Sequence, residues 1–545
     1  MCGIIGYVGN EEAPKVLIDS LKRLEYRGYD SAGIAVANGA TTELRRAEGK
    51  IDKLELLVQD DPIKGNAGIG HTRWATHGKP SEMNAHPHRS GFVTVVHNGI
   101  VENHNELKEF LLTKDYEFKS ETDTEVVCHL IDYYFKTDGE MILAIRKALK
   151  RIRGSYAFVI MNAKEPGKLY IARHGSPLVT GTSSGKSYVA SDVPAILPYT
   201  REMTFLEDGD IGVIQEGEIT LYSGSGEKIA RKAEHIPWSP LMAERGGYKH
   251  FMLKEIFEQP NVFEDAIAGR AFVEHGKVQL DALSEICAAD SFSYDEIVII
   301  ACGTSLYAGM VGKYLIESLA GVRVTVELAS EFRYRNPIIN KRMLVVPISQ
   351  SGETADTLAA LQMMKKSGVK ILSICNVIGS TMTREADATI HTHAGPEIGV
   401  ASTKAFTTQL TVLLLLALDI SGRRKHLKKA ELTKMLTELL LVPRQMQKVL
   451  EQAPSIQTIA EKYAHVNNAL FIGRGPSFPV ALEGALKLKE ISYIHAEGFA
   501  AGELKHGPIA LIESGVPVIA IALNDEVYEK MLANIEEVKA RGAEV

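Results

Sequence analysis

The second residue of the chain is a cysteine, Cys2, and a cysteine in that position can act as a nucleophile. Removal of the initiator methionine, which a small second residue favours, makes Cys2 the N-terminus. The thiol and a free α-amine then belong to one residue, and an α-amine with a pKa of about 7.7–8.0 can take and return a proton near neutral pH. Cys2 alone proves little, because a cysteine can occupy this position by chance.

Residues further along the chain supply groups that such a nucleophile needs. Asn98-Gly99 follows a β-type run, and a side-chain amide with a backbone N–H can stabilise an oxyanion. Taken alone, the pair is more simply a hairpin turn. Arg73 can grip an α-carboxylate with two hydrogen bonds. Asp123 can hold a substrate ammonium or cap the helix that follows it, and these two roles are compatible.

Together these residues resemble the glutaminase domain of class II glutamine amidotransferases, an N-terminal-nucleophile hydrolase fold. The segments 27–31 (RGYDS), 71–78 (HTRWATHG) and 97–100 (HNGI) match as well, so the resemblance spans the whole N-terminal domain. It implies that Cys2 is the nucleophile, that Asn98 and Gly99 form the oxyanion hole, and that glutamine is contacted by Arg73, Thr76, His77 and Asp123. A form that retains Met1 lacks the free amine, and we expect it to be inactive as a glutaminase.

Hydroxyl-bearing residues gather in two loops of the C-terminal half, each between an expected strand and an expected helix. The loops are residues 303–305 (GTS) and 349–354 (SQSGET). At such places in an open parallel sheet, backbone N–H groups and the helix dipole favour anions. Helix capping explains one such loop, but two in one domain favour phosphate binding. No lysine-bearing Walker pattern is present, which disfavours a nucleoside triphosphate.

The C-terminal half resembles a pair of sugar isomerase (SIS) domains, and three of its segments are similar to those of the glucosamine-6-phosphate synthase family. They are residues 349–357 (SQSGETADT), 397–406 (EIGVASTKAF) and 483–490 (EGALKLKE), and the resemblance covers essentially the entire chain. In that family the sugar substrate is fructose 6-phosphate, and ammonia travels through an internal channel between the domains. The resemblance implies that the sugar phosphate is bound by Thr304, Ser305, Ser349, Gln350, Ser351 and Thr354, and that the sugar is lined by Val400, Ala401 and Ser402.

The resemblance also implies which residues isomerise the sugar. Glu490 is the base that moves a proton between C1 and C2, and Lys487 assists near it. His506, expected from the neighbouring subunit of a dimer, helps to open the sugar ring, and Trp74 gates the ammonia channel. The chemistry agrees, because aldose–ketose isomerisation needs a carboxylate or histidine placed for proton transfer. By spacing alone, a surface ion pair of Glu490 and Lys487 on one helix is the less favoured alternative.

Periodicity predicts the elements that position these residues. Residues 1–220 carry helical patterns at 13–24 and 124–135 and short β-type runs at 4–8, 31–37, 68–71, 92–97, 157–162, 169–173, 187–190 and 211–215. These patterns predict an α+β domain with sizeable sheets. Gly, Ser, Lys and Pro accumulate from about residue 223 to 247, which marks a linker. We assign residues 221–285 to this linker and to connecting helices.

From about residue 296 a strand, loop, helix, strand pattern occurs twice. The strands expected in the first copy include 297–301 and 343–348, and those in the second include 469–472 and 516–522. Apolar strands that alternate with helices predict two α/β doubly wound parallel-sheet domains, at residues 286–425 and 455–545.

The repeat also predicts an incomplete second domain. Residues 368–371 open a further strand in the first copy, and their counterparts in the second copy, 542–545, end the sequence. We therefore expect that the chain stops within its second sheet. The family's C-terminal tail, with the lysine that forms a Schiff base with the ketose, would lie beyond Val545. On this expectation the chain as printed retains only glutamine hydrolysis and weakened sugar binding.

Composition narrows the partners and the location. The net charge is −7 and no basic tract stands out, so nucleic acid and anionic membranes find little attraction. The most apolar run, 410–418, is far shorter than the roughly 20 residues of a membrane-spanning helix, and we expect it in a buried helix. The N-terminus has no signal-peptide pattern, so cytoplasm is the expected location. The five cysteines are widely spaced, which excludes a disulfide framework and the usual zinc patterns, and no metal or cofactor is expected.

Three other classes of protein share features with this chain. Amidophosphoribosyltransferase or asparagine synthetase would need a diphosphate–ribose loop or a Ser-Gly-Gly-x-Asp nucleotide loop, and neither is present. A sugar-phosphate sensor built on SIS domains would carry a basic helix-turn-helix, whereas this chain carries Cys2 and its partners. A bare glutaminase fits the chain as printed better than it fits an intact synthase.

Overall fold

The computed structural model describes all residues except 1, 40, 240–241, 243 and 289–290. The chain divides into two units, Met1–Gly246 and Gly247–Val545, and each is described by itself.

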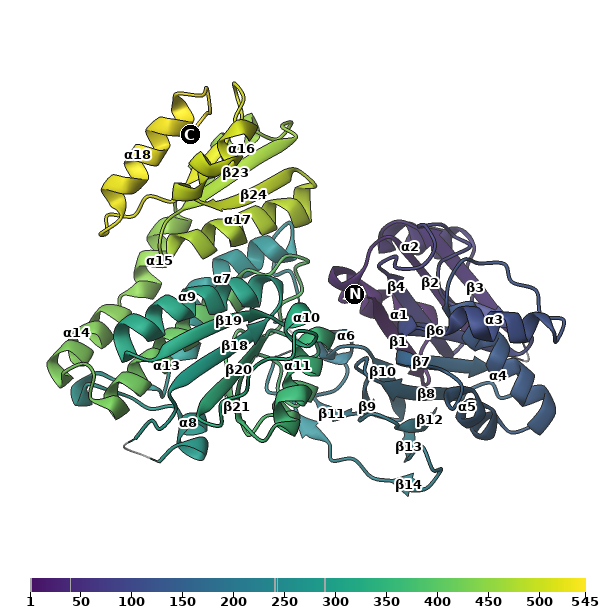
Figure 1. Cartoon of the computed structure of the whole chain (residues 1–545). Coiled ribbons are helices and arrows are strands. Elements are labelled where there is room, and N and C mark those ends of the chain that lie inside the picture. The colour runs from purple at the N-terminus through teal and green to yellow at the C-terminus, as the bar shows by residue number, and fades with distance from the viewer. Residues whose placement is uncertain (1, 40, 240–241, 243, 289–290) are drawn as a thin grey trace. The chain divides into compact units, whose positions relative to one another are not determined.

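The N-terminal unit is built on two antiparallel sheets (Figure 1). The first has eight strands, in the order β15 (Glu234–His235), β11 (Glu202–Phe205), β9 (Val179–Ser183), β10 (Lys186–Ala190), β1 (Gly3–Val8), β4 (Ala67–Arg73), β2 (Ser31–Asn38) and β3 (Thr41–Glu48). The second has seven, in the order β14 (Lys228–Ile229), β13 (Glu218–Tyr222), β12 (Ile211–Gln215), β8 (Leu169–His174), β7 (Gly154–Asn162), β6 (Val93–Val101) and β5 (His88–Ser90).

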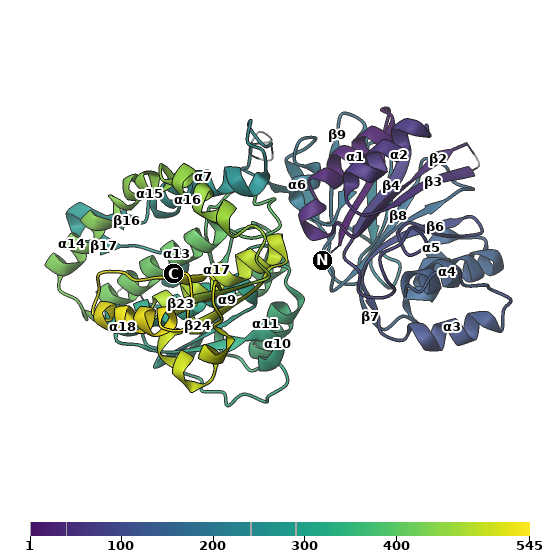
Figure 2. The ribbon, with the colours of Figure 1, turned by 90° about the horizontal axis from the view of Figure 1, so that it is seen from above.

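The two sheets pack face to face, and helices cover their outer faces. Apolar side chains from both sheets share one core, for example Ile4 and Ile69 from the first and Val159 from the second. The first sheet is covered by α1 (Ala13–Lys22) and α2 (Ile51–Asp60), and the second by α4 (Thr124–Asp138) and α5 (Met141–Leu149), with α3 (His104–Leu112) beside α4 (Figure 2). This arrangement of helix, sheet, sheet and helix layers is the predicted N-terminal-nucleophile hydrolase architecture.

The sheets continue past residue 220, where composition placed the start of the linker. Leu221 and Tyr222 of β13 pair with β14, and β15 pairs with β11 as far along as His235. The Gly- and Ser-rich residues between β13 and β14 form a turn instead of a free linker.

The C-terminal unit begins with α7 (Phe251–Ile267), the short pair β16 (Ala271–Phe272) and β17 (Lys277–Val278), and α8 (Asp281–Ile286). A five-stranded parallel sheet follows, in the order β19 (Arg323–Leu328), β18 (Glu296–Ala301), β20 (Met343–Ser349), β21 (Lys370–Cys375) and β22 (Ala388–His391). One face of this sheet is covered by α9 (Gly303–Ala320) and α13 (Lys404–Arg424), and the other by α10 (Ala329–Phe332), α11 (Ala355–Lys366) and α12 (Thr381–Glu385). Helices on both faces confirm the doubly wound prediction.

The apolar run at 410–418 lies inside α13, whose 21 residues are long and apolar enough to cross a membrane by length and composition. In the protein, 72% of its most apolar stretch is buried. Leu413, Leu415 and Leu416 pack in the core of the parallel sheet, so α13 is the buried helix that the sequence predicts.

The helices α14 (Lys429–Leu439), α15 (Val442–Leu450) and α16 (Ala453–Lys462) lead to a second parallel sheet. Its order is β24 (His495–Ala500), β23 (Asn468–Gly473) and β25 (Val518–Ala520), with α17 (Ser477–Ser492) and α18 (Tyr528–Lys539). Beyond α18, the N–H of Val518 donates to Glu544 at 2.7 Å and the N–H of Glu544 donates to Val516 at 3.0 Å. The last residues therefore lie parallel to β25, in the place that the internal repeat predicts for a further strand.

Candidate active sites

Cys2 lies just before β1, and strand pairing fixes its neighbours. β1 pairs with β4 so that Gly3 lies opposite Thr72, which places Cys2 beside the end of β4. The N–H of Trp74 donates to the Cys2 sulfur at 3.3 Å, and the thiol faces the Trp74 carbonyl at 3.6 Å. Burial is the main cause that raises the pKa of the Cys2 thiol, so the thiol needs a base to become a nucleophile.

Asn98 and Gly99 reach Cys2 from the other sheet. Both residues lie inside β6, paired with β7, so the alternative of a hairpin turn is wrong. The Asn98 Nδ2 donates to the carbonyl oxygen of Cys2 at 2.9 Å. Gly99 has a φ of +131°, and a Cβ there would lie 2.1 Å from the Ser155 oxygen. Only glycine fits this position, which sits in the strand directly after the amide that faces Cys2.

His71, which the sequence did not single out, lies behind Asn98. Its Nε2 is 3.1 Å from Asn98 Oδ1 and 2.9 Å from the His97 carbonyl oxygen. Both partners are acceptors, so Nε2 carries the hydrogen and donates it. Burial lowers the pKa of His71 to about 3, and the ring is therefore neutral. This donor holds Asn98 Oδ1 away from Cys2 and leaves the NH₂ group of Asn98 facing it.

Arg73 and Asp123 are both buried at this end of the sandwich. Arg73 Nη2 donates to the carbonyl oxygens of His77 and Gly78, while Nη1 is buried without a hydrogen-bond partner in the described part of the chain. Asp123 Oδ2 accepts the N–H of Val101 at 2.8 Å, and its side chain does not cap α4. The capping role is therefore not observed, and the carboxylate is tied to the end of β6.

The remaining predicted glutamine contacts lie in the loop after β4. The Thr76 hydroxyl is 3.4 Å from His77 Nδ1, and the His77 ring packs edge-on against His104. Trp74 in the same loop is 42% exposed and packs edge-on against Tyr29. Asn98 and Trp74 contact Cys2, and Arg73 and Asp123 are close enough to act on its thiol electrostatically. Thr76 and His77 follow in the loop after β4.

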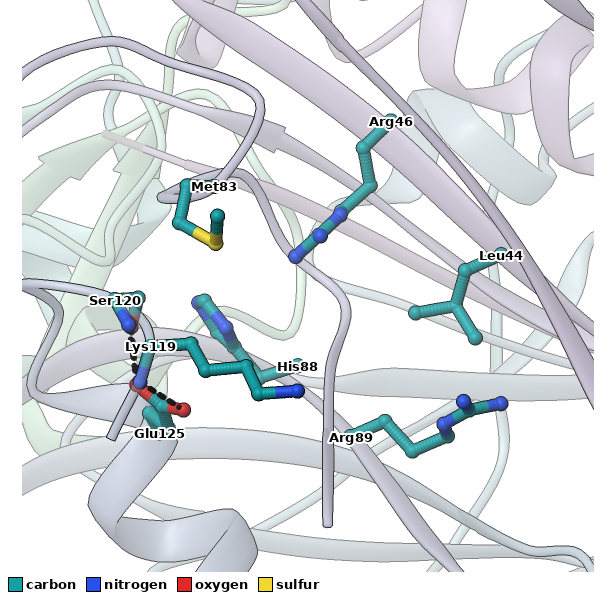
Figure 3. A pocket seen from close by; sticks show the side chains of 8 residues that line it. All are labelled: Leu44, Arg46, Met83, His88, Arg89, Lys119, Ser120 and Glu125. Carbon is teal, nitrogen blue, oxygen red and sulfur yellow. Dashed lines mark hydrogen bonds between the residues drawn. The ribbon is translucent and has the colours of Figure 1, made fainter. Parts of the chain in front are cut away.

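A cavity of about 340 Å³ lies elsewhere in this unit (Figure 3). Arg46 and Lys119 point into it, and Glu125 at its floor accepts the N–H groups of Lys119 and Ser120. The predicted glutaminase residues do not line it, so its wall is separate from the group around Cys2.

In the C-terminal unit, the two hydroxyl-bearing loops follow β18 and β20. These strands are neighbours in a parallel sheet, so both loops lie at the same edge. Ser349 Oγ is 3.1 Å from Thr354 Oγ1 and accepts the N–H of Gly352 at 3.0 Å. Ser351 Oγ accepts the N–H of Glu353 at 3.2 Å, and Gln350 lies between the two serines. Residues 349–354 therefore form one curled loop before α11, with their hydroxyl groups hydrogen-bonded within the loop.

Thr304 and Ser305 open α9 but have different partners. Ser305 Oγ accepts the amide of Gln409 at 3.0 Å. Thr304 Oγ1 donates to Glu483 Oε1 at 3.0 Å and accepts from Lys487 Nζ at 3.2 Å. Thr304 thus connects the edge of the first sheet with α17 of the second.

Lys487 and Glu490 form an ion pair of 2.6 Å on α17, and Lys487 also lies 3.3 Å from Glu483. The Lys487 side chain is only 16% exposed and touches Thr304, so the alternative of a simple surface pair is wrong. Glu483 was missed as a site residue. Burial raises its pKa to about 7, and its Oε2 has no hydrogen-bond partner in the described residues. Its position four residues before Lys487 was the available signal.

The other predicted sugar residues occupy two further places. Val400, Ala401 and Ser402 lie in one loop before α13, where the Ser402 hydroxyl donates to Glu397 at 2.9 Å. His506 is exposed at the end of the 3₁₀ segment Ala501–His506, and no hydrogen bond between it and the other predicted residues occurs in the described structure. Among the described residues, no cluster of three or more His, Cys, Asp or Glu side chains is placed to hold a metal ion.

These geometries define a glutamine amidotransferase joined to phosphosugar-binding domains, and comparison with known proteins supports this class. Residues 71–198 match the family model of the glutamine amidotransferase domain. Residues 292–419 and 462–545 match that of the SIS domain.

The relatives give the family more closely. The chain is 48% identical over 547 residues to the glutamine–fructose-6-phosphate aminotransferase (isomerising) of Caldanaerobacter subterraneus, with 100% of this chain and 89% of the relative covered. It is 48% identical over 548 residues to the Escherichia coli K12 protein of that name, with the same coverage. The chain is also similar to the solved C-terminal domain of the Francisella tularensis glucosamine–fructose-6-phosphate aminotransferase, with 46% sequence identity and a TM-score of 0.53. That match covers 55% of this chain and 84% of the solved chain. The chain belongs to the glutamine–fructose-6-phosphate aminotransferase family.

Proposed function

We propose that this protein transfers the amide nitrogen of glutamine to fructose 6-phosphate and yields glucosamine 6-phosphate and glutamate. The observation that carries this proposal is the pairing of two sites in one chain. In one unit, the amide of Asn98 faces Cys2. The other unit carries both the serine-rich loop 349–354 and the Lys487–Glu490 ion pair. Relatives of the same family, which are named for this reaction, match the chain along its whole length.

Glutamine hydrolysis begins at Cys2. With Met1 removed, the α-amine takes the thiol proton, and the thiolate attacks the side-chain carbonyl carbon of glutamine. Asn98 Nδ2 and the Gly99 N–H stabilise the oxyanion that forms. The amine returns its proton to the leaving nitrogen, ammonia departs, and water hydrolyses the thioester to glutamate.

The residues around Cys2 hold the substrate for this attack. Arg73 offers the unpaired Nη1 to the α-carboxylate, which suits the charge and the planar geometry of both groups. Asp123 binds the α-ammonium, and Thr76 and His77 complete the contacts from the loop after β4.

The sugar reaction uses the C-terminal unit. The phosphate is bound by Thr304, Ser305, Ser349, Gln350, Ser351 and Thr354, and the sugar is lined by Val400, Ala401 and Ser402. Glu490 moves a proton between C1 and C2, and Lys487 forms an ion pair with it at 2.6 Å. When Glu490 holds the proton, the Lys487 ammonium still has the Glu483 carboxylate 3.3 Å away.

Three further features complete the proposal. A second copy of the chain contributes His506 for ring opening, which makes the enzyme a homodimer through its SIS domains. Ammonia passes through an internal channel gated by Trp74. The enzyme works in the cytoplasm on small molecules, without nucleic acid, membrane, metal or redox cofactor.

The test measures glutamate and glucosamine 6-phosphate from glutamine and fructose 6-phosphate, with the full product of the gene. Cys2→Ala is expected to abolish both products made from glutamine, whereas Cys287→Ala, at a buried cysteine of the other unit, retains both. Glutamate without amino sugar in the unsubstituted protein contradicts the sugar assignment. Equal activity of Cys2→Ala contradicts the nucleophile assignment.

A further inference from the structure

The loop at residues 398–403 connects Glu397 with α13 and carries three of the proposed sugar-lining residues. The Val400 side chain is 42% exposed, whereas Ala401 is fully buried. A loop that carries such contacts needs a fixed backbone, because a displacement of about 1 Å is enough to spoil a binding geometry. The carboxylates of Glu397 and Glu255 hold the backbone of this loop.

Glu397 holds the C-terminal side of the loop. Its Oε1 accepts the N–H groups of Thr403 at 2.8 Å and Ala405 at 3.0 Å, and its Oε2 accepts the Ser402 hydroxyl at 2.9 Å. This carboxylate satisfies backbone donors at the start of α13, which the helix itself leaves without partners.

Glu255 holds the N-terminal side, from α7. Its Oε1 accepts the N–H of Ile398 at 2.6 Å and the N–H of Gly399 at 2.9 Å, and its Oε2 is 3.2 Å from the Gly399 nitrogen. A Cβ on Gly399 would lie 2.5 Å from Glu255 Oε2, so this close approach requires glycine. Glu255 is only 2% exposed.

Glu397 and Lys404 are close enough to act electrostatically on Glu255, and two lysines of this region pair with Glu258. Lys404 pairs with Glu258 at 2.8 Å, and Lys254 lies 3.4 Å from the same carboxylate. The hydrogen bonds of Glu255 go to the backbone N–H groups of Ile398 and Gly399. An ion-pair role does not account for a buried carboxylate bound to two consecutive N–H groups, but fixation of the loop does.

We propose that Glu255 is a positioning residue for the sugar, which clamps residues 398–399 against α7 while Glu397 clamps the other side of the loop, so that Val400 to Ser402 meet the carbon chain of the substrate. This inference rests on the proposed function, in which residues 400–402 line the sugar and the separate loop 349–354 binds the phosphate. Glu255 touches the loop and not the substrate. Its removal should therefore weaken recognition of the sugar and leave recognition of the phosphate intact.

The test compares two probes, fructose 6-phosphate and inorganic phosphate, by titration calorimetry on the full protein. In Glu255→Gln one acceptor oxygen remains, and in Glu255→Ala none does. We expect the Kd of fructose 6-phosphate to rise about tenfold in Glu255→Gln and further in Glu255→Ala, as the loss of hydrogen bonds to a buried acceptor predicts. The Kd of inorganic phosphate should stay within about twofold. Gly399→Ala, which displaces the same carboxylate from the loop side, should reproduce the sugar-specific loss.

Glu264→Gln is the matched control, because Glu264 is exposed on the same helix. It should leave both dissociation constants unchanged. A general loss of structure would raise both constants together in Glu255→Gln, and that result overturns the inference. An unchanged Kd of fructose 6-phosphate in Glu255→Gln and Glu255→Ala also overturns it. Failure of the proposed function is distinct, because the unsubstituted protein would then bind no fructose 6-phosphate.

Discussion

At the scale of single residues, the glutaminase site that we propose depends on the orientation of one amide. Asn98 can present either oxygen or nitrogen to Cys2, and only nitrogen stabilises an oxyanion. The neutral His71 ring selects the correct orientation through its 3.1 Å contact with Asn98 Oδ1. The sequence pointed to Asn98 by resemblance, but it gave no reason to connect His71 with it, since residues 71 and 98 meet only across the two sheets.

We predict that His71→Phe lowers kcat for glutamine hydrolysis by about tenfold to a hundredfold, somewhat less than direct loss of an oxyanion donor. The KM for glutamine should change by no more than about threefold, because Arg73 and Asp123 remain in place. Steady-state kinetics check this split. His174→Phe, at an exposed histidine of β8, is the control, and a His71→Phe enzyme with unchanged kcat contradicts the role.

At the scale of elements, the sequence predicted the strands and helices with strong apolar periodicity. The expected runs at 4–8, 297–301 and 343–348 are strands β1, β18 and β20 within one or two residues. It did not predict the edge strand β3, because TTELRRAE contains only Leu44 and Ala47 as apolar residues and so lacks the alternation expected of a strand with one buried face. It did not predict β14 and β15 either, because two-residue strands are formed by pairing and not by propensity.

The same limit applies to the sites. The resemblance supplied the residues that bear chemistry, and the structure brings most of them into two groups. Glu255 and Glu397 were not predicted, because residue 255 reaches residues 398 and 399 only through the packing of α7 on α13. Long-range hydrogen bonds of this kind leave no local pattern in a sequence.

The loop after β20, which we propose binds the phosphate, leads to a prediction at this scale. Gly352 has a φ of +67°, and a Cβ there would lie 2.0 Å from Ser380 Oγ. Gly352→Ala should therefore distort the loop and weaken inorganic phosphate and fructose 6-phosphate together, each by at least about tenfold. Titration calorimetry with both ligands measures this.

Gly368→Ala separates backbone strain from the site. Gly368 has a similar φ of +72°, and its Cβ would meet only the end of the Lys341 side chain at 3.3 Å. This variant should lose stability without losing phosphate affinity. Equal affinity loss in the two variants, or none in Gly352→Ala, contradicts a phosphate role for the loop.

At the scale of the whole molecule, buried titratable groups give the N-terminal unit the larger loss of stability in acid. In the N-terminal unit, burial lowers the pKa of His71 and His88 to about 3 and also lowers that of His86 and His97. The unfolded chain binds these protons below about pH 6.5 and the native unit does not, so stability is lost as the pH falls. In the C-terminal unit, burial lowers the pKa of His391 to about 4 and also lowers that of His393, so these two groups act in the same direction. Burial raises the pKa of the carboxyl groups of Glu255 and Glu483 to about 7. The native unit keeps these protons between about pH 4.5 and 7, so their contribution grows as the pH falls.

We predict that scanning calorimetry at pH 7 and pH 5 shows the transition of the N-terminal unit moving to lower temperature relative to that of the C-terminal unit. Each buried histidine contributes up to about 2 kcal/mol over the interval from pH 6.5 to 5. A glutamine-site ligand identifies the N-terminal transition by raising its Tm. Parallel shifts of both transitions, or a larger acid loss in the C-terminal unit, contradict the assignment of these groups.

We propose that nitrogen released at Cys2 reaches the sugar inside the protein. The most direct measurement supplies the full product of the gene with fructose 6-phosphate, glutamine labelled with ¹⁵N at its amide, and an excess of unlabelled ammonium, and determines the isotope in the amino sugar by mass spectrometry. We predict that the glucosamine 6-phosphate carries ¹⁵N despite the unlabelled ammonium. We also predict that Cys2→Ala loses this labelled product. Amino sugar that carries the isotope ratio of the medium, or no amino sugar at all, contradicts it.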